Sequence, residues 1–323
     1  MNQKTIRVSI LTIAIALALI VSAILPAGAV SAGSAPAAAV TVPTILGPKM
    51  TTLDTTPIYK WTKVTNATMY QYQVFLNGTK VLDKTPEAAD VCGASTCQKE
   101  PAFTLGLNHY QWRVRARIGF NTWTAWTYFT DFYVSPQPFT APFNGSKPGW
   151  SKLGSASWAT IYGKHLYTNG LPGKFSSIYY NKGQFSDFNF SALVKRENSS
   201  KPNYIVVRAG SLVKAGNEEW YPAYMFGYTN NGEFAVMYYN GSSHTMIQDW
   251  TATPAIIKNG WNELKVDAYG KTFKFYINGT LVKQFNSTAR ARGFVGFETF
   301  KEKYSEGRFF VDWAKMNVYS YSY

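Results

Sequence analysis

Two acidic segments carry the residue types that could do chemistry on a sugar. Glu218 and Glu219 precede two aromatic residues in "GNEEWYPAY", and Glu298 opens the glutamate-containing run "ETFKEKYSEGR". Carboxylates accept hydrogen bonds from hydroxyl groups, and aromatic rings stack on the C–H faces of sugars. The plainer interpretation of both segments is solvated loops with incidental aromatics. The candidate ligand-binding residues are Glu218, Glu219, Trp220, Tyr221, Trp250 and Glu298.

The sequence offers little material for other kinds of catalysis. It has three His and two Cys in 323 residues. Neither His165 nor His244 has a neighbouring Ser and Asp that would make a triad recognisable, and there is no H-E-x-x-H motif and no Gly-rich phosphate loop. The acidic segments also lack the alternating aspartates of a calcium loop. We therefore predict no metal site and no cofactor, and the catalytic residues, if there are any, remain unknown.

Composition favours an exported β protein over a cytosolic α/β enzyme. Hydrophobic residues make up 46% of the chain and aromatic residues 16%, whereas charged residues make up only 15%, below the roughly 25% of an average soluble domain. The net charge is +14, of which +9 falls in residues 139–323. These basic residues are scattered singly and form no nucleic-acid-binding motif. The expected partner is a glycan or cell-envelope polymer, and no specific nucleic acid.

The N-terminus has the pattern of an export signal. Lys4 and Arg7 precede an apolar run at 8–25, and two small-x-small cleavage sites follow. We predict a signal peptide at 1–32, a linker at 33–41, and a secreted or cell-surface location. The run just reaches membrane-spanning length, so an uncleaved anchor is the alternative, and it would be the chain's one connection to a membrane.

Cys92 and Cys97 lie five residues apart in the turn-rich segment "DVCGASTCQKE". In an oxidising compartment such a pair is expected to form a disulfide that closes a small loop. A metal site would need two further ligands, and no His is close in sequence.

Residues 42–135 show about seven short alternating runs, which predict a small β-sandwich. The segment at 109–118 places Tyr110, Trp112, Val114 and Ala116 on one face, and Asn77-Gly78 predicts a hairpin. Trp61, "LGLNHYQWRVRA" and "WTAW" resemble a fibronectin type III domain. That resemblance implies a tyrosine corner formed by Leu107 and Tyr110. A linker is expected at 136–140.

Residues 141–323 read as many longer antiparallel strands, which predict a jelly roll and complete an all-β fold of two sandwiches. The meander "NGWNELKVDAYGKTFKFYINGTLVKQF", with "GFVGFETF" and "FFVDWAKM" after it, resembles the concanavalin A-like lectin/glucanase superfamily. Laminin G-like and 3-keto-disaccharide hydrolase-like domains are the relatives that this pattern suggests.

The resemblance implies a glycan ligand but identifies no catalytic residue. Laminarinase-type members carry E-x-D-x-x-E on one strand, and this chain lacks it; Glu263 and Asp267 are interpreted as surface residues. The favoured hypothesis is non-catalytic binding of a glycan or cell-surface polymer. A secreted hydrolase of the 3-keto-disaccharide type and a structural or adhesive surface protein are the alternatives. A pocket that joins Glu218, Glu219, Trp220 and Glu298 would favour a sugar site.

Overall fold

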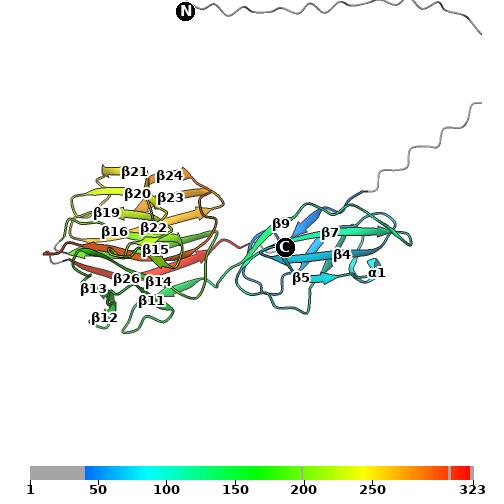
Figure 1. Cartoon of the computed structure of the whole chain (residues 1–323), viewed down its shortest axis with the longest axis horizontal. Coiled ribbons are helices and arrows are strands. Elements are labelled where there is room, and N and C mark those ends of the chain that lie inside the picture. The colour runs from blue at the N-terminus through cyan, green and yellow to red at the C-terminus, as the bar shows by residue number, and fades with distance from the viewer. Residues whose placement is uncertain (1–40, 198, 305–306, 321–323) are drawn as a thin grey trace, which may run out of the picture. The chain divides into compact units, whose positions relative to one another are not determined.

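The computed structural model describes residues 41–197, 199–304 and 307–320. The predicted signal peptide at 1–32, and the predicted linker up to residue 40, lie outside the described residues. The described chain is almost entirely β-structure, and it forms two β-sandwiches that follow each other in sequence (Figure 1). No helix in this part of the chain has the length and apolar character needed to cross a membrane.

The N-terminal sandwich has a three-stranded and a six-stranded sheet. The smaller sheet has the order β1 (Ile45–Gly47), β3 (Tyr59–Thr62), β6 (Thr96–Lys99). The larger sheet has the order β2 (Met50–Thr52), β9 (Thr130–Val134), β7 (His109–Ile118), β4 (Ala67–Leu76), β5 (Thr79–Lys84), with β8 (Thr122–Trp123) beside β7. A four-residue helix, α1 (Ala88–Val91), precedes β6.

Strict alternation along β7 builds the core of this sandwich. Tyr110, Trp112, Val114 and Ala116 are all buried, as the two-residue period of a strand requires. The predicted hairpin is confirmed between β4 and β5, and its two turn residues both have positive φ, as a type I′ turn needs. The Cys92–Cys97 disulfide is also confirmed.

Half of the predicted tyrosine corner is present. The hydroxyl of Tyr110 donates to the carbonyl of Gly106 at 3.1 Å, the upstream backbone bond that defines the corner. The role assigned to Leu107 is wrong, because its side chain is 45% exposed and packs in no core.

Replacing Tyr110 by Phe should therefore lower the free energy of unfolding by about 1 kcal/mol, the net value of one hydrogen bond. The ring stays in the core, so only the hydroxyl is lost. Urea denaturation would measure the change. Tyr128→Phe is the matched control, since Tyr128 is 97% exposed and should respond by less than about 0.3 kcal/mol. Equal effects of the two substitutions would contradict the corner.

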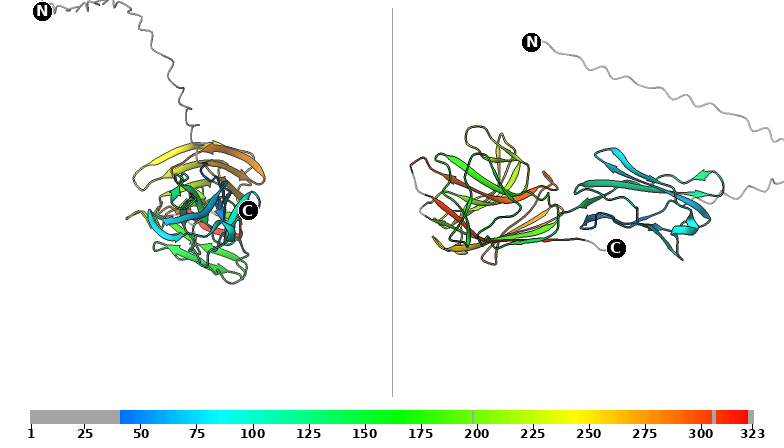
Figure 2. Two further views of the ribbon diagram at one scale, coloured as in Figure 1. Left: turned by 90° about the vertical axis from the view of Figure 1, so that its right-hand side faces the viewer. Right: turned by 90° about the horizontal axis from the view of Figure 1, so that it is seen from below.

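The C-terminal sandwich consists of two large antiparallel sheets (Figures 1 and 2). The eight-stranded sheet has the order β12 (Ala159–Ile161), β13 (His165–Thr168), β26 (Arg308–Val318), β15 (Phe188–Glu197), β22 (Trp261–Tyr269), β23 (Thr272–Ile277), β24 (Thr280–Asn286), with β10 (Phe139–Ala141) on β26. The seven-stranded sheet has the order β11 (Trp150–Leu153), β14 (Lys174–Tyr180), β25 (Phe294–Lys301), β16 (Asn203–Ala209), β19 (Ala223–Tyr228), β20 (Glu233–Tyr239), β21 (His244–Ala252). A short ribbon pairs β17 (Leu212–Val213) with β18 (Trp220–Tyr221).

The meander that carried the concanavalin A-like resemblance is confirmed as β22, β23 and β24. Leu264 and Val266 pair with Ile277 and Phe275, and all four side chains are buried between the sheets. The predicted linker at 136–140 is partly wrong, because β10 begins at Phe139 and pairs with β26. The all-β jelly-roll sandwich expected for this half of the chain is therefore present.

The seven-stranded sheet carries apolar side chains on both faces. Its inner face contributes to the main core, and its other face holds a second buried cluster. The segment 210–222, which contains the β17–β18 ribbon, contributes to this outer cluster through Trp220. Half-buried residues packed against the cluster are Leu153, Phe175, Tyr179, Tyr221, Trp250 and Phe294. The outer face of the seven-stranded sheet thus carries a buried apolar cluster bordered by side chains that are partly exposed.

Candidate functional site

Two glutamates, Glu219 in the segment 210–222 and Glu298 in β25, lie close enough for their charges to interact, and we call them the acid centre. Glu298 lies in β25 on the same face as the outer cluster, and it is fully buried. Its Oε2 atom accepts hydrogen bonds from Ser177 Oγ at 2.6 Å and from the backbone N–H of Trp220 at 2.8 Å. Ser177 lies directly opposite Glu298 in the pairing of β14 with β25. One hydrogen bond from β14 and one from the short strand β18 therefore fix this carboxyl.

The second oxygen of Glu298 gives the acid centre its unusual electrostatics. Oε1 is buried and has no hydrogen-bond partner among the described residues. Burial raises the pKa of Glu298 to about 8, and the nearby charge of Glu219 adds to the rise, while the bonds from Ser177 and Trp220 oppose it. The uncharged acid is favoured at neutral pH because burial away from water penalises the charged form. Such a group is a candidate general acid.

Glu219 connects the acid centre to the surface. Its Oε1 lies 2.6 Å from His244 Nε2, and its Oε2 accepts from the Asn217 side-chain amide at 3.2 Å. The Glu219 side chain is only 5% exposed, whereas that of His244 is 39% exposed. The His244 ring stacks on Tyr239 with the centroids 4.2 Å apart. A ligand would therefore meet His244 first, and the two carboxyls lie behind it.

The structure brings only part of the predicted site together. Glu219, Trp220 and Glu298 converge, but Trp220 is fully buried and its Nε1 donates to the carbonyl of Gly210 at 2.8 Å. Its ring is therefore not available as a surface platform. Glu218 turns away: it pairs with Lys174 at 2.8 Å and accepts from the backbone of Ser155 at 2.7 Å. The bond from Lys174, more than that from Ser155, lowers the pKa of Glu218.

The two remaining candidates, Tyr221 and Trp250, lie at the edge of the outer cluster. Both are half-buried. Tyr221 packs over Gly241, where a Cβ would come within 2.4 Å of the tyrosine ring, so Gly241 makes this packing possible. Trp250 belongs to β21, the outermost strand of the sheet. Each exposes part of an aromatic ring, which is what contact with a sugar requires.

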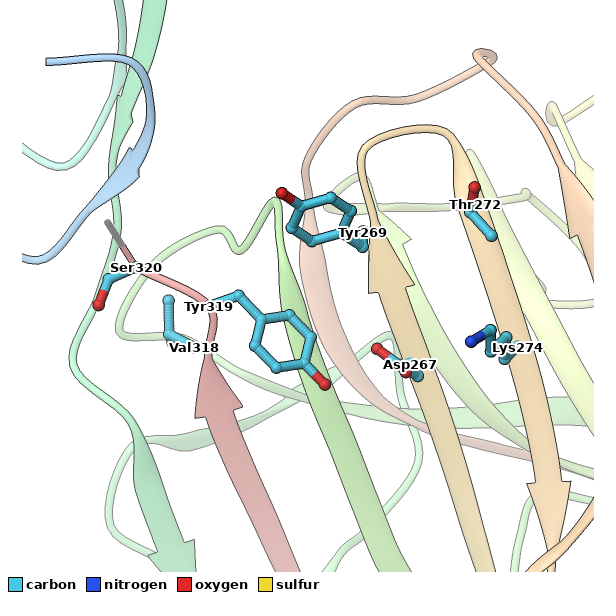
Figure 3. A pocket seen from close by; sticks show the side chains of 7 residues that line it. All are labelled: Asp267, Tyr269, Thr272, Lys274, Val318, Tyr319 and Ser320. Carbon is cyan, nitrogen blue, oxygen red and sulfur yellow. The ribbon is translucent and has the colours of Figure 1, made fainter. Parts of the chain in front are cut away.

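A second, open site lies on the outer face of the eight-stranded sheet, and we call it the tyrosine cleft (Figure 3). Its volume is about 670 Å³, within the roughly 300–1,000 Å³ of typical ligand pockets. The strands β22 and β23 supply one wall, and the end of β26 supplies the other. The lining residues are Asp267, Tyr269, Thr272, Lys274, Val318, Tyr319 and Ser320.

The polar groups of the tyrosine cleft surround two aromatic rings. Asp267 and Lys274 are opposite each other in the pairing of β22 with β23. The rings of Tyr269 and Tyr319 have centroids 6.2 Å apart at an angle of 69°, and Tyr269 is 43% exposed. Burial, and next the negative charge of Asp267, raise the pKa of Tyr319. The cleft therefore offers a hydrogen-bond acceptor, a cationic donor and an aromatic surface, the combination that binds a sugar ring.

The tyrosine cleft is poor in acidic groups. Its lining contains one carboxylate, Asp267, whereas glycoside hydrolysis uses a pair of carboxyl groups that flank the scissile bond. Among the described residues, no group of three or more His, Cys, Asp or Glu side chains is placed to hold a metal ion.

Sequence reasoning missed this cleft for an identifiable reason. Asp267 was interpreted as a surface residue and Tyr269 was not considered as a site residue, although both are on the same face of β22 by alternation. That alternation was a usable signal. Tyr319 is more than 40 residues away in sequence, and only the pairing of β26 with β15 and of β15 with β22 brings it near.

Comparison with known proteins gives a family match and several distant structural likenesses. The family model of the 3-keto-alpha-glucoside-1,2-lyase-like domain matches residues 138–309. A carbohydrate-binding module from Bacillus subtilis is 21% identical, with a TM-score of 0.41, and the match covers 53% of this chain and 99% of the module. The β-glucanase of Bacillus licheniformis is 10% identical, with a TM-score of 0.43, over 57% of this chain and 99% of the enzyme. A search of curated proteins found no match.

Proposed function

The chain belongs to the family of the 3-keto-alpha-glucoside-1,2-lyase-like domain, and from that premise we propose that it binds a glycan through its C-terminal sandwich without cleaving it. The observation that carries the proposal is the tyrosine cleft, where Tyr269 and Tyr319 adjoin Asp267 and Lys274 in an open site. A sugar stacked on Tyr269 could donate a hydroxyl hydrogen bond to Asp267 and accept one from Lys274. These contacts would fix the orientation of the sugar ring in the cleft.

The proposal includes export of the protein to the cell surface or the medium. The apolar run at 8–25 behind Lys4 and Arg7 supports it. The disulfide between Cys92 and Cys97 also supports it, because such bonds persist in oxidising compartments. N-terminal sequencing of the protein from the medium and from the membrane fraction would test both export and cleavage. A protein confined to the cytosol would contradict this part of the proposal.

We further propose that residues 42–135 are a fibronectin type III-like module that presents the glycan-binding sandwich. The division into a three-stranded and a six-stranded sheet and the Tyr110–Gly106 hydrogen bond support this assignment.

Replacing Tyr269 by Ala should weaken glycan binding by up to about tenfold, since a lost stacking contact costs roughly 0.5–1.5 kcal/mol. Asp267→Asn should weaken binding to a similar extent by removing an acceptor. Calorimetric titration of the whole chain against soluble polysaccharides and oligosaccharides would measure both effects, with product analysis on the same samples.

Tyr162→Ala is the matched control for these titrations. Tyr162 is 77% exposed and lies between β12 and β13, far along the sheet order from β22 and β23. Its loss should change affinity less than twofold. If Tyr162→Ala and Tyr269→Ala weaken binding equally, or if neither does, the glycan site is not the tyrosine cleft.

A second candidate function, cleavage of a glycosidic bond, is favoured by one specific observation. Glu298 has the raised pKa of a general acid, Glu219 lies close enough to influence it, and Oε1 is buried without a partner in the described chain. Because Oε1 is buried, a substrate could reach it only if the surrounding chain moved; the segment 210–222, which holds the other oxygen through the N–H of Trp220, is one part that could move. Products in the titration samples that disappear with Glu298→Gln, while binding remains, would place this function first.

A further inference from the structure

Three arginines of β7 lie against aromatic rings on the outer face of the six-stranded sheet, and two of them, Arg113 and Arg115, each contact more than one ring. The guanidinium carbon of Arg113 is 4.4 Å from the ring centroid of Trp126, and that of Arg115 is 4.5 Å from the same ring. Arg115 is also 4.4 Å from the ring centroid of Trp123, and Arg117 lies 6.0 Å from that ring. Cations and rings therefore alternate along the strand. We call these five residues the arginine–tryptophan ladder.

The segment after β8 is built to hold this ladder. Thr124 and Thr127 form the hydrogen bonds with the backbone of β7 that a neighbouring strand would otherwise form. Their hydroxyls accept from the N–H groups of Ala116 and Val114 at 3.0 and 3.1 Å. Their own N–H groups donate to the carbonyls of the same two residues at 2.8 and 3.0 Å. The tryptophan that precedes each threonine is thereby fixed on the arginine side, so the ladder belongs to the frame of the domain.

A row of side chains on β4 and β5 orients the guanidinium groups. Nε and Nη2 of Arg113 both donate to Gln73, at 3.0 and 2.8 Å, and those of Arg115 donate to Gln71, at 3.0 and 2.7 Å. Both glutamine amides donate in turn to Asp83. Among the described residues, Nη1 of Arg113 and of Arg115 has no hydrogen-bond partner. Each guanidinium is thus held at one edge and stacked on its faces, with one nitrogen left for a ligand.

We propose that the arginine–tryptophan ladder binds an acidic polysaccharide, a linear glycan that carries sulfate, phosphate or carboxylate groups. Alternate residues on a strand are about 6.7 Å apart, so the ladder presents a row of cationic donors at that interval. Guanidinium groups suit such anions because they donate in parallel pairs and keep their charge. The ladder lies in the N-terminal sandwich and takes an anionic ligand, so this inference goes beyond the neutral sugar proposed for the tyrosine cleft.

The stacking itself argues for an anionic glycan over other polymers. The guanidinium groups of Arg113 and Arg115 stack on Trp126, and those of Arg115 and Arg117 on Trp123. These rings are therefore engaged and cannot serve as stacking platforms for neutral sugars. Single-stranded nucleic acids need the same free rings, because their bases stack on aromatic side chains. What the ladder leaves for a partner is positive charge and N–H donors.

The test uses the full chain, with dextran sulfate as the probe and neutral dextran of equal length as the reference ligand. Affinity is measured over a salt series for the wild type and for the double variant Arg115→Gln, Arg117→Gln. We expect at least a tenfold loss at low salt, and a shallower dependence of log affinity on log salt, by about one per arginine removed. Neutral dextran should bind no variant through the ladder.

The matched control removes the same charge from the other sheet of the same sandwich. Lys60→Gln with Lys63→Gln alters β3 and its following loop and should weaken dextran sulfate binding less than twofold. Residues 139–323 carry a net charge of +9 and supply a background common to all variants. Equal losses in the two double variants would mean diffuse attraction, and would overturn the proposal.

Two further arms keep the test decisive. If the glutamine variant fails to fold by circular dichroism, Arg115→Lys with Arg117→Lys retains the charge and removes the planar fork. This variant should still lose at least threefold, and unchanged affinity would contradict the ladder. A single-stranded DNA of equal charge should bind more weakly than dextran sulfate. Tighter, ladder-dependent binding of the DNA would replace the glycan by a nucleic acid and overturn the proposal.

Discussion

The stability of the wild-type chain should fall between pH 4.5 and 8 by up to about 5 kcal/mol more than that of the Glu298→Gln variant. In the folded chain, burial raises the pKa of Glu298 from 4.5 to about 8. The acid therefore keeps its proton in the folded state and loses it in the unfolded state across this interval. Its contribution to stability is complete below pH 4.5 and is lost as the pH rises towards 8. At roughly 1.4 kcal/mol per pH unit, the interval sets the upper limit given above.

Urea denaturation at a series of pH values would measure this difference. Glu298→Gln is the informative variant because the amide has the shape of the uncharged acid and can still accept from Ser177 and Trp220 through its oxygen. All other titrating groups are common to the two proteins, so subtracting the two profiles isolates Glu298. Parallel profiles would show that Glu298 is ionised in the folded chain at neutral pH, and the case for a general acid in the acid centre would fail with them.

Glu218, which precedes Glu219 in the chain, provides a control with the opposite pH dependence. Glu218 has a pKa below its ordinary value because it accepts from Lys174 and from Ser155. Its contribution to stability is therefore present above the unfolded value and is lost as the pH falls, which is opposite in sign to that of Glu298. Glu218→Gln should thus weaken the chain most at neutral pH, whereas Glu298→Gln should weaken it least there. The opposite slopes would separate Glu218 from Glu298, two glutamates that the sequence analysis placed in one candidate site.

The two sandwiches could be predicted from the sequence because strand alternation and turn residues are each determined by a few neighbouring positions. The alternation of Phe273, Phe275 and Ile277 reflects the two faces of one strand, and Asn278-Gly279 supplies the positive φ values of one turn. Each of these is decided within a few residues. The disulfide between Cys92 and Cys97 also closes a short loop, and their spacing, together with the expected oxidising compartment, was enough to predict it.

The candidate sites could not be predicted in the same way, because they depend on sheet order and on burial. Glu298 and Trp220 are 78 residues apart, and they meet through a hydrogen bond between β25 and the short strand β18. An aromatic residue next to two glutamates resembles a surface platform, yet Trp220 faces the sheet and Glu218 faces Lys174. The tyrosine cleft requires that β26 lies two strands away from β22 in the sheet. The residue types indicated which chemistry was possible, whereas the order of the strands and the burial of each side chain determine where the sites lie.

Gly296→Ala should destabilise the chain by at least about 3 kcal/mol and should also disrupt the acid centre. Gly296 lies in β25, two residues before Glu298, and a Cβ there would come within 2.1 Å of the carbonyl oxygen of Ile178 and 2.8 Å of the Cα of Tyr179. Both are backbone atoms of the neighbouring β14, so no side-chain movement can relieve the clash. Overpacking costs about 1–3 kcal/mol where side chains can adjust, and here the pairing of two central strands must open.

Separating β14 from β25 would also remove the support of Glu298, since Ser177 in β14 donates to that carboxyl. The variant should therefore be less stable than the wild type at both pH values. It should also lack the decrease in stability between pH 4.5 and 8 that the raised pKa of Glu298 causes in the wild type. Thermal and urea denaturation at pH 5 and pH 8 would measure both quantities. Gly106→Ala is the control, because a Cβ at Gly106 meets its nearest neighbour at an ordinary 3.8 Å, and it should change stability by less than about 1 kcal/mol. A Gly296→Ala chain as stable as this control would show that β14 and β25 are not packed closely at Gly296, and the burial that gives Glu298 its raised pKa would then lack its structural basis.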